Sequence, residues 1–254
     1  MPSDFDNKEL KKIISFSVYG KHPVYTYGAI ENALLAQDLF PGWICRFYYN
    51  STLDLKIVNA LKSISNTELV LIDTHKGAGN TAWRFRPMFE SDIDIVISRD
   101  ADSRLNPRDA ACVKEWLASD KDFHLIRDHY WHNVLILAGM FGTRNKVLHP
   151  IKEQFDKFDF GNRQAVDQAF LSHIVYKYIT DIKQFYSHDE QHLYEPDSHH
   201  KFPETDYKGY IGEVIENVDM ACCFLGEEPF QIKSEDNTLR RDMSELSELL
   251  ESQN

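Results

Sequence analysis

The sequence has few cysteines, no long apolar run and no excess of positive charge. Its four cysteines show no CxxC spacing, so free thiols in a reducing compartment are expected rather than a disulfide framework. No run approaches the roughly 18 apolar residues of a membrane span, and the N-terminus has no apolar signal core. We therefore expect no transmembrane segment and a cytoplasmic location.

The net charge of the 254 residues is −12. A chain this acidic is not expected to bind nucleic acid or an anionic membrane through an overall basic field. A local basic pocket for one phosphorylated ligand is still compatible with it. The length and the 43% hydrophobic content fit one globular domain with a full core.

Short apolar runs alternate with amphipathic segments along the first half of the chain. Strands are expected at 12–19, 43–49, 68–73 and 92–97, and helices at 27–40, 53–65 and 107–119. This alternation predicts an α/β fold, with a mostly parallel central sheet flanked by helices in a Rossmann-like arrangement.

The second half of the chain is less regular. Strands are expected at 122–127 and 134–140, a helix at 165–182 and a loop at 185–202. Residues 1–11 are expected to form a flexible lead-in and 236–254 an acidic helix or tail. Residues 12–235 are then predicted to be a single domain.

The most informative stretch is DIDIVISRDADSR, at 92–104, in which Asp100 and Asp102 follow a predicted buried strand. In an open α/β sheet, ligands bind at the carboxyl ends of the strands. Two carboxylates one residue apart and outside a helix can bind one hard cation, such as Mg²⁺ or Mn²⁺. Because such a cation usually also carries a substrate phosphate, the pair predicts an enzyme that acts on a diphosphate. A chance pair on a surface loop is the plain alternative.

Two other metal motifs fit this stretch less well. An EF-hand would require a ligand and a glycine where Arg104 and Leu105 stand. A phosphatase of the haloacid dehalogenase type would have its pair near the first strand. It would also have Thr or Val after the second aspartate, where this chain has Ser103.

Other candidate ligand groups follow two of the predicted strands. Ser17, Tyr19 and Gly20 end the first strand with a hydroxyl, an aromatic face and backbone amides. A nucleobase could stack on Tyr19, although an ordinary turn with a half-buried tyrosine explains the pattern equally well. Asp73 ends the third strand, where it could accept a hydrogen bond from a base or a ribose, or cap the next loop.

Two arginines are candidates for contacting phosphate. Arg84 lies in WRFRP just before the aspartate strand, and Arg99 directly precedes Asp100. The planar guanidinium group is suited to bidentate phosphate contact. The alternatives are a surface arginine paired with acidic neighbours for Arg84, and an internal counterion of the aspartate pair for Arg99.

Three later features could complete the same site. The glycines of LAGMFG, at 137–142, suit a backbone that lies close to a bulky ligand, or a plain turn. Asp167 precedes Gln168 near the start of a predicted helix, where it could point into the cleft or act as a first-turn acid. His188 could give the metal a nitrogen ligand, although a lone loop histidine is more often solvated.

The order of these motifs (strand-SVYG, Arg84, strand-DAD, GMFG, DQAF helix, late His) resembles the GT-A fold of nucleotide-sugar-dependent glycosyltransferases, over about residues 13–218. The WRFRPMF and SRDADSR stretches also resemble small glycosyltransferase domains of bacteria and large DNA viruses. The resemblance implies that Asp100 and Asp102 hold Mn²⁺ or Mg²⁺ against the donor diphosphate. As in glycogenin-like retaining members, it places Asp167 near the donor sugar and His188 in the metal shell. The HxxGxxKPW ending of those members is absent.

We therefore expect a metal-dependent glycosyltransferase that moves a sugar from a nucleotide diphosphate sugar, with UDP favoured, to a saccharide acceptor. Arg84 or Arg99 would stabilise the leaving group and Asp167 the oxocarbenium-like sugar, with Asp128 a second candidate for contacting sugar or acceptor. Retention is the favoured outcome. The alternatives are a metal-dependent phosphatase or nucleotidyltransferase, and a catalytically silent nucleotide-sugar or carbohydrate-binding scaffold.

Overall fold

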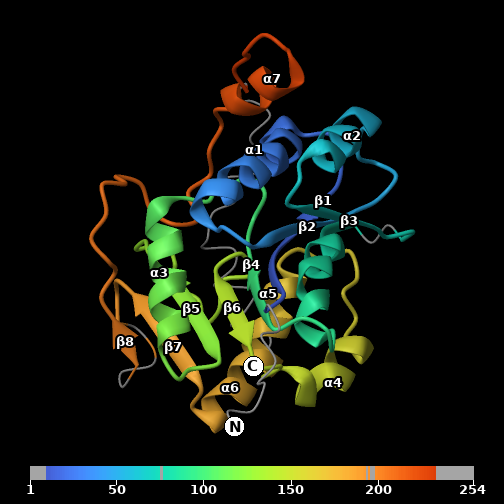
Figure 1. Ribbon diagram of the computed structural model, residues 1–254. Helices are drawn as coiled ribbons and strands as arrows, with labels where there is room; N and C mark the ends of the chain where they lie inside the picture. The colour runs from blue at the N-terminus through green and yellow to red at the C-terminus, as the bar shows by residue number, and fades with distance from the viewer. Residues whose placement is uncertain (1–9, 75–76, 193, 195–197, 233–254) are drawn as a thin grey trace, which may run out of the picture.

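The computed structural model describes residues 10–74, 77–192, 194 and 198–232, which build an α/β structure around one sheet (Figure 1). Eight strands lie in the order β3-β2-β1-β4-β6-β5-β7-β8. They are β1 (Lys12–Val18), β2 (Ile44–Tyr49), β3 (Thr67–Leu71), β4 (Ile95–Ser98), β5 (Phe123–Arg127), β6 (Phe141–Arg144), β7 (Phe185–Asp189) and β8 (His199–His200). Only β6 runs antiparallel to its neighbours, β4 and β5. The expected α/β class with a mostly parallel sheet is confirmed.

Helices cover both faces of this sheet. They are α1 (Pro23–Leu39), α2 (Leu55–Ser63), the 3-10 helix η1 (Gly77–Phe89), α3 (Pro107–Ala118), η2 (His149–Ile151), α4 (Lys152–Lys157), α5 (Val166–Phe170), the π-helix η3 (Leu171–Tyr176), α6 (Lys177–Ile182) and α7 (Asp219–Leu225). One hydrophobic core lies between the sheet and α1, α2 and α3, and a second lies between the sheet and η1, α5, η3 and α6. The chain therefore has the three layers of a doubly wound fold.

Local sequence explains these elements. Alternation along β1 sends Ile14 and Phe16 into the first core and Ile13 into the second. The side chain of Asn106 accepts a hydrogen bond from the N–H of Asp109 (2.9 Å) and so caps α3. The continuous helical run from α5 to α6 confirms the helix expected at 165–182.

The strand expected at 134–140 is wrong, because the strand in this region is β6, which begins at Phe141. Side chains from elsewhere hold the 134–138 backbone in place of a neighbouring strand. Arg127 donates to the carbonyl oxygens of Val134 (2.9 Å) and Leu135. Gln168 binds the carbonyl of Ile136 and the N–H of Ala138. The apolar sequence is buried without forming a ladder.

The loop expected at 185–202 is also wrong in part, because β7 and β8 fall inside it. The polar residues of β7 hide the strand from a periodicity argument. His188 and Asp189 are almost fully buried, and they satisfy their polar groups through side chains of β5 and α3. Gly77–Phe89, where no helix was expected, forms η1.

The position of β6 brings three chain segments to one place. β1 and β4 are parallel neighbours, so their carboxyl ends meet, with Ser15 opposite Ser98. Because β6 is antiparallel to β4, Ser98 also lies opposite Phe141, where β6 begins. The residues after β1, after β4 and before β6 are therefore adjacent.

Helix α1 packs directly on the loop that carries the aspartate pair. A Cβ atom added at Gly28 would lie 2.1 Å from the carbonyl oxygen of Ala101, which is too close for any real contact. Glycine at this position lets the helix approach the backbone between Asp100 and Asp102.

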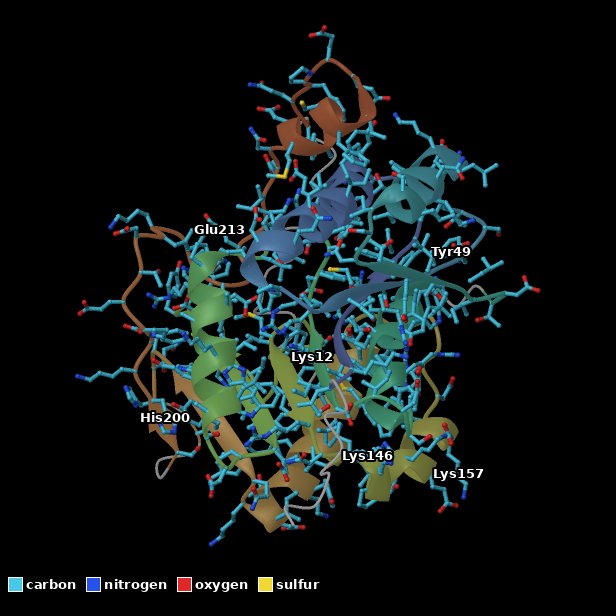
Figure 2. The ribbon with its side chains drawn as sticks, in the orientation of Figure 1. Lys12, Tyr49, Lys146, Lys157, His200 and Glu213 are labelled. Atoms are coloured by element: carbon cyan, nitrogen blue, oxygen red, sulfur yellow. The ribbon has the colours of Figure 1, made fainter. Side chains whose placement is uncertain are left out.

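The outer surface carries charged side chains, such as that of Lys157 on α4 (Figure 2). Within the described residues, no helix is long and apolar enough to cross a membrane. The expected tail at 236–254 and most of the expected lead-in lie outside the described residues.

Candidate active site

Three residues nominated separately by the sequence form one ionic cluster. The guanidinium of Arg84, on η1, donates to Oδ1 of Asp100, and it donates to Oδ2 of Asp167, on α5, at 3.2 Å. The side chains of Arg84 and Asp167 are only 5% and 9% exposed, whereas that of Asp100 is 42% exposed. The cluster is therefore anchored in the protein and opens to solvent through Asp100.

Ser17 positions Arg84. The backbone N–H of Arg84 donates to Ser17 Oγ (3.1 Å), and the Ser17 hydroxyl donates to the carbonyl oxygen of Thr81 (3.0 Å). These bonds fix η1 to the end of β1. The hydroxyl expected to face a ligand is used inside the protein.

Asp102 adds a third negative charge near Arg84, beside those of Asp100 and Asp167. Burial, and then the charge of Asp100, raise the pKa of Asp102 to about 7, with Arg84 acting in the opposite sense. The charges of Asp100, Asp167 and Asp102 all act on Arg84. Two carboxylates thus bond the guanidinium of Arg84 and the charge of a third acts on it, with Arg104 also acting on Asp102. A divalent cation would offset the excess of negative charge at this place.

The donor set at this loop suits Mn²⁺ or Mg²⁺. Asp100 and Asp102 supply hard oxygen ligands. Within the part of the chain that the structure describes, no three His, Cys, Asp or Glu side chains converge to hold a metal by themselves. A cation held by this pair would therefore take its other ligands from water and from phosphate oxygens, as Mg²⁺ commonly does.

The glycine-rich stretch before β6 packs against this cluster. A Cβ atom at Gly139 would lie 1.8 Å from Oδ2 of Asp100, so the nearest group is a carboxylate. The side chain of Gln168 accepts from the N–H of Ala138 (2.6 Å) and donates to the carbonyl of Ile136 (3.0 Å). The Asp-Gln pair thus has a divided role: Asp167 binds Arg84, and Gln168 fixes the backbone that leads to Gly139.

The residues expected to contact a nucleoside, namely Tyr19, Gly20 and Asp73, have different surroundings in the structure. Burial raises the pKa of Tyr19, and Arg84, Asp167 and Asp100 also act on it, so its hydroxyl lies within their field. Its ring meets that of Trp83 edge to face, with 5.8 Å between centroids. The N–H of Gly20 donates to Thr52 Oγ1 (2.7 Å). Asp73 is exposed after β3, two strands away from β1.

Arg99 is not available as a diphosphate ligand, so that prediction is wrong. Its guanidinium forms a bidentate pair with Asp109 of α3 (2.8 and 2.6 Å) and also donates to the carbonyl of Ser98. Both side chains of the pair are at most 3% exposed. Arg99 is an internal counterion, but of Asp109 and not of the aspartate pair.

Asp128 and His188 are likewise engaged elsewhere. Both carboxylate oxygens of Asp128 accept from Arg108 (2.8 and 2.6 Å), and Oδ2 also accepts from the N–H of Ile211. His188 is fully buried, with Nδ1 bonded to His124 (2.9 Å) and Nε2 to Glu115 (3.1 Å). Both side chains are therefore bonded to groups other than the aspartate pair. Asp128 holds the 211 segment, and His188 belongs to a buried histidine pair.

Two residues near the cluster escaped the sequence argument. Burial and then the charges of Asp102 and Asp100 raise the pKa of Tyr25, on α1. His132 is 9% exposed and accepts a hydrogen bond at Nδ1 from the N–H of Asp128 (3.1 Å). Burial lowers the pKa of His132 to about 4, with Asp100 acting in the opposite sense. A tyrosine inside a helix and a histidine in the HYWH loop carry no local signal.

We expect His132→Asn to reduce the loss of stability in acid. The folded pKa of His132, about 4, lies below the unfolded value of 6.5, so the unfolded chain binds the proton first as the pH falls. Asparagine can accept the same hydrogen bond but does not titrate. Between pH 7 and pH 5, urea unfolding should show wild type losing about 2 kcal/mol more than the variant. Equal losses would contradict the assignment.

No family model and no curated protein matches this chain. Among solved structures it is similar to S. aureus TarS, with a TM-score of 0.49 and 18% identity over 71% of this chain and 35% of that chain. TarS 1-349 in complex with UDP gives 0.45 and 16%, over 63% and 54%. The mannosyltransferase PcManGT from Pyrobaculum calidifontis, in complex with GDP-Man and Mn²⁺, gives 0.47 and 15%, over 79% and 59%. The chain spans between 35% and 59% of the length of these structures.

Proposed function

We propose that this chain is a metal-dependent glycosyltransferase that uses a nucleotide diphosphate sugar. The observation that carries the proposal is the Arg84 bridge, in which one buried guanidinium joins Asp100, after β4, to Asp167 of α5. The cluster lies at the carboxyl ends of β1 and β4, where α/β sheets bind ligands. Its surplus of carboxylates fits a divalent cation, and a cation with open positions fits a diphosphate.

In this proposal Asp100 and Asp102 hold Mn²⁺ or Mg²⁺, which when bound neutralises the charge of the departing nucleoside diphosphate. Arg84 provides a second, fixed positive charge at the same place. Transfer breaks the bond between the anomeric carbon and the diphosphate oxygen, forms a bond from that carbon to the oxygen of an acceptor hydroxyl, and passes the hydroxyl proton to the departing diphosphate. Asp167, which Arg84 binds, would stabilise the oxocarbenium-like carbon.

Two further details belong to the proposal. Retention stays favoured because both oxygens of Asp128, the other candidate carboxylate, already accept hydrogen bonds from Arg108, and its side chain is only 2% exposed to an acceptor hydroxyl. The ring of Tyr19, beside Trp83, offers a face for the nucleobase at the end of β1. UDP remains the favoured nucleotide and a saccharide the favoured acceptor.

We expect one nucleoside diphosphate to stabilise the protein only when Mn²⁺ is present. A thermal-shift panel of UDP, GDP, CDP, ADP and TDP, each with Mn²⁺ or with EDTA, measures this directly. A ligand at a hundred times its dissociation constant adds about 2.7 kcal/mol of stability. The shift should disappear in Asp102→Asn and persist in Asp38→Asn, a matched change on the exposed side of α1.

Three outcomes would count against the proposal. If no diphosphate raises the melting temperature, the donor site is not where we place it. If the shift is equal in EDTA, the aspartate pair does not act through a cation. A diphosphate that binds with Mn²⁺ but is never released from any sugar donor would favour the silent scaffold.

A further inference from the structure

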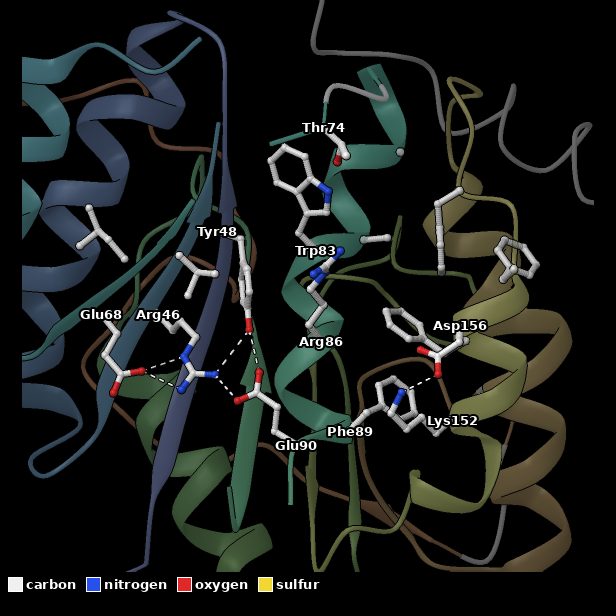
Figure 3. Close-up of a pocket in the computed structure, with 17 residues that line it drawn as sticks. Arg46, Tyr48, Glu68, Thr74, Trp83, Arg86, Phe89, Glu90, Lys152 and Asp156 are labelled. Atoms are coloured by element: carbon white, nitrogen blue, oxygen red, sulfur yellow. Dashed lines mark hydrogen bonds and ion pairs between the residues drawn. The ribbon is translucent and has the colours of Figure 1, made fainter. Parts of the chain in front are cut away.

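A hollow of about 790 Å³ lies along η1 and outside the aspartate cluster (Figure 3). Its lining comes from β2 and β3 on one side of η1 and from α4 and the segment up to Phe160 on the other. Asp100, Asp102 and Asp167 do not line it. The volume falls within the range of small-molecule sites in proteins. We call this hollow the η1 groove.

The groove exists because one face at the edge of the sheet is not covered. Arg46 and Tyr48 of β2 point to this face, together with Glu68 and Val70 of β3, since alternate residues of a strand share a side. Helices α1 and α2 pack on the opposite face. β3 is the edge strand, and its residues remain only partly buried. The uncovered face is available to a ligand.

The charges that line the groove balance one another. Arg46 donates to Glu68 and to Glu90, each at 2.8 Å, and the hydroxyl of Tyr48 donates to Glu90 (3.3 Å). The side chain of Arg46 is 6% exposed, whereas those of Glu68 and Glu90 are 37% and 38% exposed. Each carboxylate therefore keeps surface available for hydrogen bonds from a ligand.

Across η1, Lys152 pairs with Asp156, and the exposed guanidinium of Arg86 lies between the two sides. Three cationic side chains (Arg46, Arg86, Lys152) thus face three carboxylates (Glu68, Glu90, Asp156). No net charge is left to select an anion or a cation. The ligand that fits is neutral and rich in groups that both donate and accept hydrogen bonds.

Aromatic side chains stand between these polar groups. Phe155 and Phe158 on the α4 side are partly exposed to the groove, whereas Trp83 and Phe89 of η1 line it with only 5% and 7% of their surface exposed. Flat apolar surface next to bidentate polar groups suits a pyranose, whose ring has an apolar C–H face and a rim of hydroxyls. We infer that the η1 groove binds a neutral oligosaccharide.

The groove is separate from the proposed transfer site, but consecutive residues of the sequence contribute to the two places. Trp83 lines the groove and directly precedes Arg84, and its ring also meets Tyr19. A glycan held here would be retained near the aspartate cluster. The binding itself needs neither donor nor cation, so it can be tested without the proposed function.

The test is calorimetric titration with malto-, cello-, chito- and manno-oligosaccharides, without nucleotide or metal. At least one series should bind, and Arg86→Ala and Glu68→Gln should each weaken it by about tenfold or more. Glu68→Gln keeps an acceptor for Arg46, and Arg86 is exposed, so both variants should fold. Glu153→Gln, an exposed change on α4 outside the groove, should bind like wild type.

Four results would overturn the inference. The first is that none of these oligosaccharides binds. The second is binding that both groove variants leave unchanged. The third is binding that Asp102→Asn abolishes while the groove variants retain it, because the saccharide would then sit at the aspartate cluster. The fourth is that an extended peptide binds along β3 while no saccharide binds, because the occupant of the groove would then be a peptide.

Discussion

Asp102→Asn should abolish sugar transfer and leave the protein folded. Asparagine keeps the shape of the side chain but removes the charge that would bind the cation, so we expect the rate to fall by about 10³-fold or more. Stability should be equal or higher at pH 8. Burial and the charge of Asp100 raise the pKa of Asp102 from 3.8 to about 7 in the fold, so its ionised form costs stability at and above that pH.

The measurement is release of nucleoside diphosphate from the donor that the binding panel selects, together with a melting curve for each variant. Asp38→Asn removes a carboxylate from an exposed position on α1 and should behave like wild type. Full activity of Asp102→Asn would remove Asp102 from the metal site. An unfolded variant would instead give Asp102 a structural role that its surroundings do not suggest.

Arg84→Met should give the largest loss of stability. Methionine fills much of the same volume but leaves Asp100 and Asp167 without the guanidinium that they share. Removing one partner from a buried ionic group costs about 3–5 kcal/mol, because the remaining charge stays desolvated. Transfer should be lost as well, since Asp167 would no longer be held in position.

Urea unfolding gives the size of the stability effect. Arg86→Met lies two residues farther along η1 on an exposed side chain, and we expect a change within about 0.5 kcal/mol. Arg84→Lys should fall between the two, because lysine keeps the charge but not the fork that reaches both carboxylates. An Arg84→Met protein as stable as Arg86→Met would show that the bridge does not support the fold.

The sequence was a good guide where local pattern decides the structure. Apart from η1, the strands and helices of the first half follow from apolar periodicity, and the start of α3 follows from Asn106 and Pro107. The aspartate pair was recognisable because a buried strand precedes it. Arg84 and Asp167 were nominated from residue type, and only the fold shows that they meet at Asp100.

The sequence failed where a distant partner decides the structure. The charge of Arg99 is evident from the sequence, but its engagement with Asp109 depends on how α3 packs. The backbone at 134–138 is held by Arg127 and Gln168 instead of by a strand. Gly28 looks like a weak point in a helix until Ala101 is seen against it. Gln168 and Ala138 are 30 residues apart and Gly28 and Ala101 are farther still, while the arginine contacts span a loop that has no periodic pattern to reveal them.

The antiparallel strand β6 also has a consequence for how the molecule folds. β1 to β4 pair among themselves, and β5 pairs with β7, so two partial sheets can form from separate stretches of chain. β6 closes the seam between them, with Ile97 opposite Gly142. Until β6 pairs with them, β4 and β5 are edge strands whose unpaired N–H and C=O groups can pair with strands of other chains. Aggregation during synthesis should therefore depend on this four-residue strand more than on any helix.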